Sequence, residues 1–176
     1  MKSLTRGKMW CYAIGQLGWS IISGLIGSWL VYFYQPDAVA KSEGMISLIP
    51  EGRVVFGVLT IIGLITAGGR IFDAITDPLI GNWSDKCRSK LGRRIPFMRY
   101  SAIPLGLIFI LVFCTPIKGV SGINVAWLFI FVALYYFAIT CYCTPYTSLL
   151  AELAHTQDEK LKLSTCISLT FIVGTA

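Results

Sequence analysis

Long apolar runs separated by short polar segments constrain this sequence more than any other feature. The runs occupy residues 9–34, 54–83, 97–115, 123–146 and 164–176. A helix needs about 20 mostly apolar residues to cross roughly 30 Å of hydrocarbon, so the first four runs predict full spans and the fifth a partial one. Charged residues make up only 14% of the chain, against about 25% in soluble domains. The sequence therefore predicts an all-α, polytopic membrane helix bundle.

Lysine and arginine residues are divided unevenly between the predicted loops. Most of them lie in residues 1–8, 86–99 and 160–162, which fall on one side of the membrane if each run crosses it once. Cytoplasmic loops carry such an excess of basic residues. We therefore expect a multi-pass protein of the cell membrane with a cytoplasmic N-terminus. The net charge of +6 is interpreted as a mark of membrane orientation, and no nucleic acid partner is expected.

Three ionisable residues interrupt the second apolar run, at Arg70, Asp73 and Asp77. Their i, i+3 and i+7 spacing places them along one face of a helix. Ionisable groups at membrane depth cost about 2.5 to 3.5 kcal/mol each on insertion scales. Arg70 is the expected charge partner of one carboxylate. The other carboxylate then needs a proton or a bound cation, because like charges one helical turn apart repel each other in a low dielectric.

Neighbouring oxygen atoms add to this prediction. Thr76 supplies a hydroxyl, and Pro78 has no N–H, so a carbonyl oxygen one turn earlier lacks its helical donor. Hard cations prefer carboxylate, hydroxyl and carbonyl oxygens. The residues predict a site for Na⁺ or H⁺ at Asp73 and Asp77, with Na⁺ as the bound metal if sodium is the coupling ion, and no other cofactor. The alternative is a structural ion pair, with Asp77 solvated near the cytoplasmic surface.

The polar segment after the second run combines glycines with clustered charges, which predicts a tight cytoplasmic turn. Its defining residues are Gly81, Asp85, Lys86, Gly92, Arg93 and Arg94. Glycine allows close helix approach and positive φ angles, and a carboxylate among basic side chains can pair with them. This pattern resembles the loop signature of the major facilitator superfamily.

Two further segments carry a more specific resemblance. Residues 70–78, which read Arg-Ile-Phe-Asp-Ala-Ile-Thr-Asp-Pro, resemble the second-helix motif of the glycoside-pentoside-hexuronide:cation symporter family, a branch of that superfamily. Residues 143–149, followed by Glu152, resemble the end of the family's fourth helix. The resemblance implies that residues 1–176 form the N-terminal half of the superfamily's fold, which a C-terminal bundle of the same protein would complete.

The resemblance also implies a set of cation ligands. The two aspartates that bind the cation in this family correspond to Asp73 and Asp77. The polar residue before the second aspartate corresponds to Thr76, and the cation-site threonine of the fourth helix corresponds to Thr140. All four residues offer oxygen atoms, so the site inferred from the charges has a counterpart in the family.

The solute-binding residues are expected on the first and fourth helices. Two family positions that hold aspartates correspond here to Ser20 and Cys143. Tyr142 and Tyr146 lie one helical turn apart beside Pro145, and we expect them to line a cavity because aromatic rings stack on sugar faces. The missing aspartates leave the solute open, since the family also includes carriers of uronides and lysolipids.

Together these observations predict a secondary active transporter, not an enzyme, that couples Na⁺ or H⁺ to a solute of the sugar or glycoside type. Its expected partners are the lipid bilayer, the solute and the C-terminal bundle. A lysolipid solute is one alternative. Another is a small non-transporting membrane protein that acts as an assembly partner or regulator, which the chain length favours. A membrane-embedded enzyme has less support, because only Asp73 and Asp77 resemble a catalytic carboxylate pair.

Overall fold

A computed structural model describes residues 5–50, 52–55 and 59–175 of the chain. In chain order, its elements are α1 (Arg6–Tyr34), α2 (Ala38–Ser42), β1 (Arg53–Val55), β2 (Leu59–Thr60), α3 (Ile61–Lys86), α4 (Ile95–Val112), α5 (Gly122–Leu153) and α6 (Gln157–Thr175). The two short strands form one small antiparallel hairpin. The prediction of a membrane helix bundle is confirmed.

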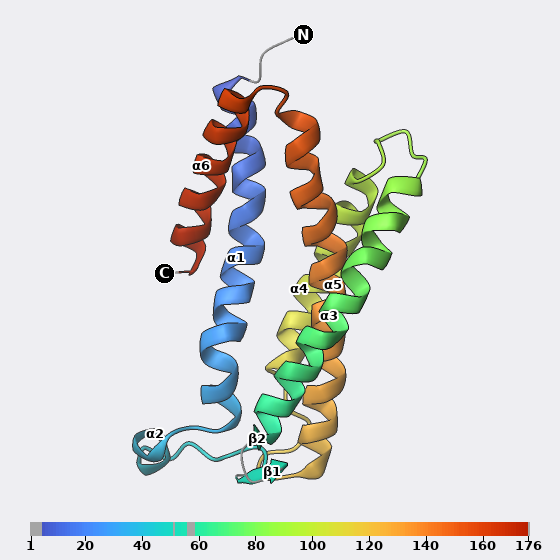
Figure 1. Ribbon diagram of the computed structural model, residues 1–176. Coiled ribbons are helices and arrows are strands. Elements are labelled where there is room, and N and C mark those ends of the chain that lie inside the picture. The colour runs from blue at the N-terminus through green and yellow to red at the C-terminus, as the bar shows by residue number, and fades with distance from the viewer. Residues whose placement is uncertain (1–4, 51, 56–58, 176) are drawn as a thin grey trace.

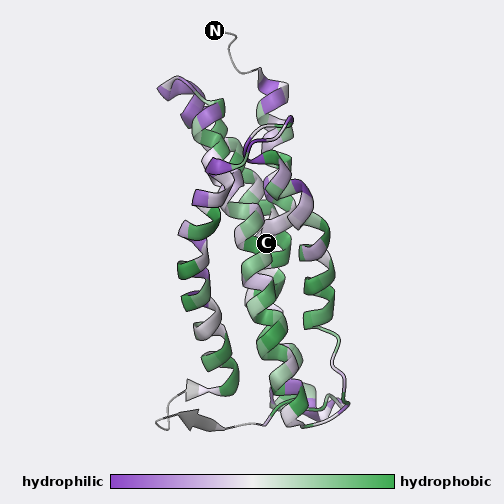
Figure 2. Cartoon of the chain, turned by 90° about the vertical axis from the view of Figure 1, so that its right-hand side faces the viewer, coloured by the Kyte–Doolittle hydropathy of each residue, from purple (hydrophilic) through white to green (hydrophobic). Residues whose placement is uncertain are grey.

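The long helices run side by side between two ends of the molecule (Figure 1). α1 packs along α6, and α5 packs against both α3 and α4. The start of α1, the turn from α3 to α4 and the connection from α5 to α6 lie at one end, while α2 and the hairpin lie at the other (Figure 1). Hydrophilic residues gather toward the ends and hydrophobic stretches lie between them (Figure 2). This banding is the arrangement expected of helices that cross a bilayer.

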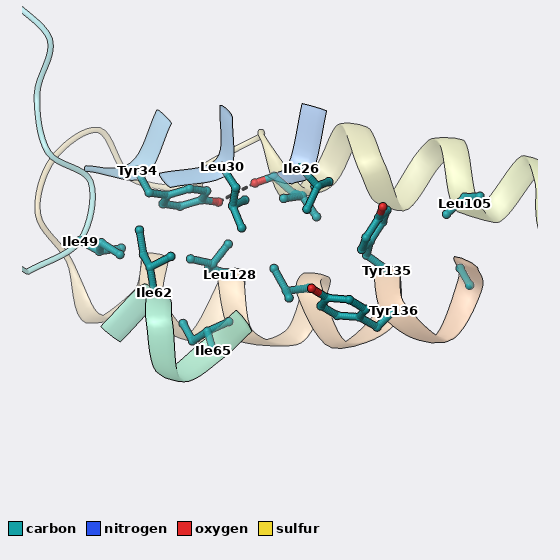
Figure 3. Close-up of a cluster of buried hydrophobic side chains, with 13 residues drawn as sticks. Ile26, Leu30, Tyr34, Ile49, Ile62, Ile65, Leu105, Leu128, Tyr135 and Tyr136 are labelled. Atoms are coloured by element: carbon teal, nitrogen blue, oxygen red, sulfur yellow. Dashed lines mark hydrogen bonds between the residues drawn. The ribbon is translucent and has the colours of Figure 1, made fainter. Parts of the chain in front are cut away.

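Buried apolar side chains from α1, α3, α4 and α5 form one cluster, shown in part in Figure 3. Leu30 of α1 and Leu128 of α5 are almost completely buried in it. The hydroxyl of the buried Tyr34 donates to the backbone oxygen of Val112 at 2.5 Å and so joins α1 to α4. Within a bilayer, lipid is as apolar as these side chains, so close packing rather than exclusion from water stabilises such contacts.

One buried polar side chain, Asn124, ties together the loops next to α5. Its Nδ2 atom donates to the backbone oxygens of Leu48, Ile117 and Gly119, each at 2.9 Å. Its Oδ1 accepts from the backbone N–H of Ile117 at 3.3 Å. Asn124 is 0% exposed, and buried backbone oxygens without a donor are costly, so this side chain fixes how the loops meet.

The helix of the second predicted span, α3, begins later than predicted. The sequence analysis starts the second span at residue 54, whereas α3 begins at Ile61 because the hairpin takes up residues 53–55 and 59–60. Thr60 is the N-cap of α3, and its Oγ1 accepts from the Gly63 N–H at 3.1 Å. Residues 56–58 of the predicted span lie outside the described residues.

Other boundaries differ at helix ends. The predicted fourth span ends at residue 146, but α5 continues to Leu153, because a proline removes one hydrogen bond and the residues after Pro145 include good helix formers. α6 begins at Gln157, well before the predicted start at 164. A capping box precedes it: Thr156 Oγ1 accepts from the Glu159 N–H at 3.2 Å, and Glu159 Oε2 accepts from the Thr156 N–H at 3.4 Å. Residue 176 lies outside the described residues.

Three of the described helices, α1, α4 and α5, are long and apolar enough to cross a membrane. α3 is not among them because Arg70, Asp73 and Asp77 lie near its middle, although its 26 residues would extend about 39 Å. The outer face of α4 exposes large apolar side chains, including Tyr100 at 78% and Ile103 at 73%. Apolar surface of this kind suits contact with lipid, and the chain is an integral membrane protein.

Candidate functional site

The charged face of α3 lies against α5. Gly69, directly before Arg70, is buried against the ring of Tyr136, and a Cβ at this position would overlap the ring atoms Cδ2 and Cε2. Glycine therefore permits the close approach of the two helices here. This approach brings Asp73 and Asp77 within reach of polar side chains on α5.

Each of these two aspartates accepts a hydrogen bond from a threonine of α5. Thr140 Oγ1 donates to Asp73 Oδ1, and Thr144 Oγ1 donates to Asp77 Oδ1 at 2.8 Å. The acceptors are four residues apart on α3 and the donors four apart on α5, so one turn of each helix matches one turn of the other. The structure thus brings together Asp73, Asp77 and Thr140 as predicted, and it adds Thr144, which the sequence analysis missed.

A cavity of about 780 Å³ lies beside the two pairs. Its charged lining residues are Arg70, Asp73 and Asp77, one positive and two negative, which leaves a net charge of one negative on the described lining. Much of the remaining wall is apolar or aromatic and is contributed by Trp19, Ile26, Leu30, Val31, Tyr135, Tyr136, Ile139 and Phe171. Trp19 Nε1 is buried without a hydrogen-bond partner among the residues described.

Arg70 does not form the ion pair that its spacing predicts. Among the described residues, neither Asp73 nor Asp77 lies within 4.0 Å of its guanidinium as an ion-pair partner. The guanidinium carbon instead lies 5.5 Å from the centre of the Tyr136 ring, a cation–π contact. The ring occupies the space beside Gly69, the residue directly before Arg70.

Thr76 is not placed where the sequence analysis expects it. It is 5% exposed and is absent from the lining of the cavity. Its Oγ1 donates to the backbone oxygen of Asp73 at 3.2 Å. Since successive helical residues are about 100° apart, a residue beside Asp77 cannot share its face. The hydroxyl expected from Thr76 is supplied to Asp77 by Thr144.

The two predicted cavity tyrosines join α5 to α1 instead. Tyr142 Oη donates to the backbone oxygen of Gly15 at 3.2 Å. Tyr146 is stacked on Tyr12 with ring centres 4.4 Å apart, its hydroxyl donates to the Tyr12 backbone oxygen at 2.7 Å, and the Tyr12 hydroxyl donates to the Tyr146 backbone oxygen. The expectation that Tyr142 and Tyr146 line the cavity is wrong, because hydrogen bonding to α1 turns both rings into a helix contact.

Of the other two predicted solute residues, only Cys143 lies in the cavity wall. Ser20 is fully buried between α1 and α6, where a Cβ on Gly174 would lie 2.6 Å from the Ser20 Cβ. The Ser20 hydroxyl donates to the backbone oxygen of Gln16 at 2.7 Å. A small side chain at this position therefore allows α6 to pack closely along α1.

The donor set around the two aspartates consists of oxygen atoms. No group of three or more His, Cys, Asp or Glu side chains that could hold a metal ion is present in the described parts of the chain. Two carboxylates and two hydroxyls are ligands that suit hard cations. Chemically, the arrangement can hold a cation or a proton between α3 and α5 at the edge of a cavity.

Comparison with known proteins identifies the family. Residues 11–176 match the family model described as MFS/sugar transport protein. The chain belongs to this family. The membership agrees with the resemblance seen in the sequence, and it indicates a transporter rather than an enzyme.

Several relatives of this chain are named symporters. An uncharacterized symporter, sll1374 of Synechocystis, is 32% identical over 87% of this chain and 26% of its own length. Sodium-dependent lysophosphatidylcholine symporter 1 of Homo sapiens is 30% identical over 85% of this chain and 27% of its own length. The putative glycoside/cation symporter YagG of Escherichia coli is 39% identical over 39% of this chain and 15% of its own length. The chain thus spans about a quarter or less of the length of these relatives.

The charged turn between α3 and α4 joins the ends of three helices. Arg94 Nη2 lies 3.1 Å from Asp85 Oδ1, and Arg94 Nε lies 3.3 Å from Glu152 Oε1. Arg93 Nη2 donates to the same Glu152 oxygen at 2.7 Å. The ion pairs connect the end of α3, the start of α4 and the end of α5, and we call this group of four residues the clasp.

The remaining residues of the predicted turn fit their expected local roles. Gly92 has a φ of +98°, a backbone conformation that favours glycine. A Cβ on Gly81 would lie 3.8 Å from Thr144 Cγ2, so this position faces α5. Lys86 is the last residue of α3, where a basic side chain interacts favourably with the helix dipole.

Proposed function

We propose that this chain supplies the ion-binding and part of the solute-binding surface of a symporter, in which inward movement of Na⁺ or H⁺ drives uptake of a sugar or glycoside-type solute. The observation that carries the proposal is the pair of hydrogen-bonded carboxylates, Asp73–Thr140 and Asp77–Thr144, at the edge of a cavity. No cation among the described side chains forms an ion pair with either carboxylate.

Charge explains how binding of the ion favours binding of the solute. With both aspartates ionised, the lining carries one more negative than positive charge, because Arg70 offsets only one of them. Bound Na⁺ or a proton brings that sum to zero, which lowers the cost of excluding water from the cavity. The ion then favours the state in which the solute is enclosed, and the two binding events are coupled.

The cavity suits a small organic solute in size and composition. Ligand pockets commonly have volumes of about 300 to 1,000 Å³ and combine apolar walls with a few polar groups. Tyr135 and Tyr136 present aromatic rings, while Ser23, Thr140 and Cys143 add polar atoms. Aromatic faces and hydroxyl partners suit a glycoside, and the relative YagG is named a putative glycoside/cation symporter.

A second candidate solute is a lysolipid, and the apolar wall of the cavity favours it. Trp19, Ile26, Leu30, Ile139 and Phe171 provide a surface that an acyl chain can cover, and the human relative is named a lysophosphatidylcholine symporter. The two candidates differ in what Arg70 would bind: a phosphate for the lysolipid and hydroxyl groups for the glycoside.

The N-terminus, the clasp and the α5–α6 connection are proposed to face the cytoplasm, because basic residues concentrate at this end. We propose the plasma or inner membrane as the location. The cavity walls supplied by this chain would be completed by a C-terminal bundle of the same protein, as the greater length of the relatives suggests.

Uptake by the full-length protein in proteoliposomes tests the proposal. We expect labelled glycosides or lysophosphatidylcholine to accumulate under an inward Na⁺ or H⁺ gradient, and Asp73→Asn and Asp77→Asn each to abolish this accumulation. Asp158→Asn is the matched control, because Asp158 is an exposed residue at the start of α6. Accumulation that survives both cavity substitutions would contradict the proposal. Absence of any gradient-driven uptake by the wild type would favour the non-transporting alternative.

A further inference from the structure

Two cavities outside the ion and solute site meet at one residue, Cys87. The first has a volume of about 780 Å³ and is formed by the turn between α3 and α4, with Lys86, Arg88 and Lys90 in its lining. The second, of about 510 Å³, lies between α4 and α5. Cys87 lines both, so the basic pocket and the space between the two helices adjoin at this residue.

The pocket in the turn carries positive charge that no acidic side chain of the described residues neutralises. Of its charged lining residues, Asp85 is paired with Arg94, and Arg93 is paired with Glu152 in the clasp. The other cations, Lys86, Arg88 and Lys90, have no ion-pair partner in the described parts of the chain, and all three are exposed. An anion in this pocket would therefore meet three unpaired cations.

The second cavity, between α4 and α5, is called the groove below. It is lined almost entirely by apolar side chains. Phe97, Pro104 and Ile108 of α4 form one wall, and Leu134 and Phe137 of α5 belong to the other. From residue 97 to residue 108 a helix rises about 16 Å, which is close to half the roughly 30 Å hydrocarbon thickness of a bilayer. The groove is thus about as long as one lipid leaflet is deep.

We propose that the pocket and the groove together bind one anionic phospholipid of the adjoining leaflet. Its phosphate would lie among Lys86, Arg88 and Lys90, and one acyl chain would lie along the groove beyond Cys87. Basic pockets next to membrane helices attract anionic headgroups at about 1 kcal/mol per Lys or Arg. The turn that holds the headgroup also carries three residues of the clasp, so bound lipid would stabilise this junction of α3, α4 and α5. The site is separate from the ion and solute cavity and does not depend on the proposed transport activity.

Lipid-dependent thermal stability and binding of the purified full-length protein test this inference. We expect phosphatidylglycerol vesicles, but not phosphatidylcholine vesicles, to raise the apparent Tm. The triple variant Lys86→Gln, Arg88→Gln, Lys90→Gln should bind phosphatidylglycerol roughly a hundredfold more weakly, from three charges at the value above. The matched control neutralises Arg6, Lys8 and Lys160, which are exposed and belong to the first turns of α1 and α6. These helix starts lie at the same end of the molecule as the turn between α3 and α4 (Figure 1), and the control should retain the preference for phosphatidylglycerol.

A groove variant separates a lipid site from a site for phosphate alone. Cys141→Phe fills the groove from α5 and should weaken phosphatidylglycerol binding, whereas Cys141→Ala should not; the Tm without lipid shows that both variants fold. Equal stabilisation by the two lipids, or equal loss in the control triple variant, would overturn the inference. So would binding of glycerol 3-phosphate as tight as binding of the lipid. Unchanged lipid binding by a folded Cys141→Phe would also overturn it, because the lipid would then not use the groove.

Discussion

Two adjacent glycines of α3 give a sharp test of how α3 and α5 approach each other. A Cβ on Gly69 would overlap the ring of Tyr136, whereas a Cβ on Gly68 would meet no atom within 4 Å. Gly68→Ala and Gly69→Ala are therefore the same chemical change at adjacent residues. Gly68→Ala adds a methyl group where there is space, and Gly69→Ala adds it where the Tyr136 ring already lies. The second change must displace a ring that also contacts Arg70.

The expected changes in stability differ between the two variants. Glycine in a helix interior is less favourable than alanine by roughly 0.5 to 1 kcal/mol, so Gly68→Ala should stabilise the protein by about that amount. Overpacking at a closed position costs roughly 1 to 3 kcal/mol. Gly69→Ala should then range from about neutral to about 2.5 kcal/mol destabilising, and the two variants should differ by the overpacking cost.

Thermal unfolding of the full-length protein in detergent measures the difference. The cysteines in the described residues are free, so a thiol-reactive dye can report their exposure as the helices separate. We expect a higher apparent Tm for Gly68→Ala and a lower one for Gly69→Ala. If Gly69→Ala raises Tm as much as its neighbour does, α3 and α5 are not in contact at Tyr136, and the placement of both aspartates against α5 loses its basis.

Three further predictions concern single side chains. Thr144→Val removes the hydroxyl that donates to Asp77. Since hydrogen bonds to charged groups are worth about 1.5 to 3 kcal/mol, this change should raise the cation concentration for half-maximal uptake at least tenfold. Thr147→Val is the control, because the Thr147 hydroxyl donates to backbone oxygens of α5 itself, and it should leave that concentration unchanged. Asn124→Leu should destabilise the protein by about 2 to 4 kcal/mol, because its four side-chain hydrogen bonds to backbone groups are lost, and an unchanged Tm would contradict its role in joining the loops. Arg94→Lys should reduce the free energy of unfolding by up to about 1 kcal/mol and so lower Tm, because one ammonium cannot keep the ion pairs with both Asp85 and Glu152. Arg99→Lys, outside the clasp, should leave Tm unchanged.

The fold could be predicted from the sequence where a residue pattern is compatible with one type of structure only. Apolar runs of sufficient length predict membrane helices, and three of the described helices, α1, α4 and α5, are long and apolar enough to cross a membrane. The ends were harder to predict. The predicted fourth span ends at residue 146, yet α5 passes through Pro145 and continues to Leu153, because one missing hydrogen bond costs less than ending a helix whose neighbours still favour it.

The candidate site was predictable on α3 and less so on its partners. Charge spacing on one helix identifies Asp73 and Asp77 without knowledge of the fold. Which hydroxyls meet them depends on how α3 and α5 are rotated, and a sequence does not report rotation. Thr144 could have been found from its four-residue spacing to Thr140, which matches the spacing of the aspartates.

For the two tyrosines, the sequence analysis assigned residues to the cavity that the structure places elsewhere. Tyrosine is a residue type that suits a solute site, but the hydroxyls of Tyr142 and Tyr146 donate to backbone oxygens of α1. A buried Tyr hydroxyl usually has a hydrogen-bond partner, and such a partner from a distant helix cannot be read from local sequence. The same holds for Ser20, whose burial depends on the approach of α6.

Direct binding of the cation tests the central claim most simply. Isothermal titration of the purified full-length protein with NaCl, in choline chloride, should give one site per chain for a sodium symporter; for a proton symporter, the same protein should take up one proton per chain as the pH is lowered. Asp73→Asn and Asp77→Asn should each abolish the signal, and Asp158→Asn should keep it. Retention of the wild-type signal by both cavity variants would mean that the carboxylates between α3 and α5 do not bind the ion.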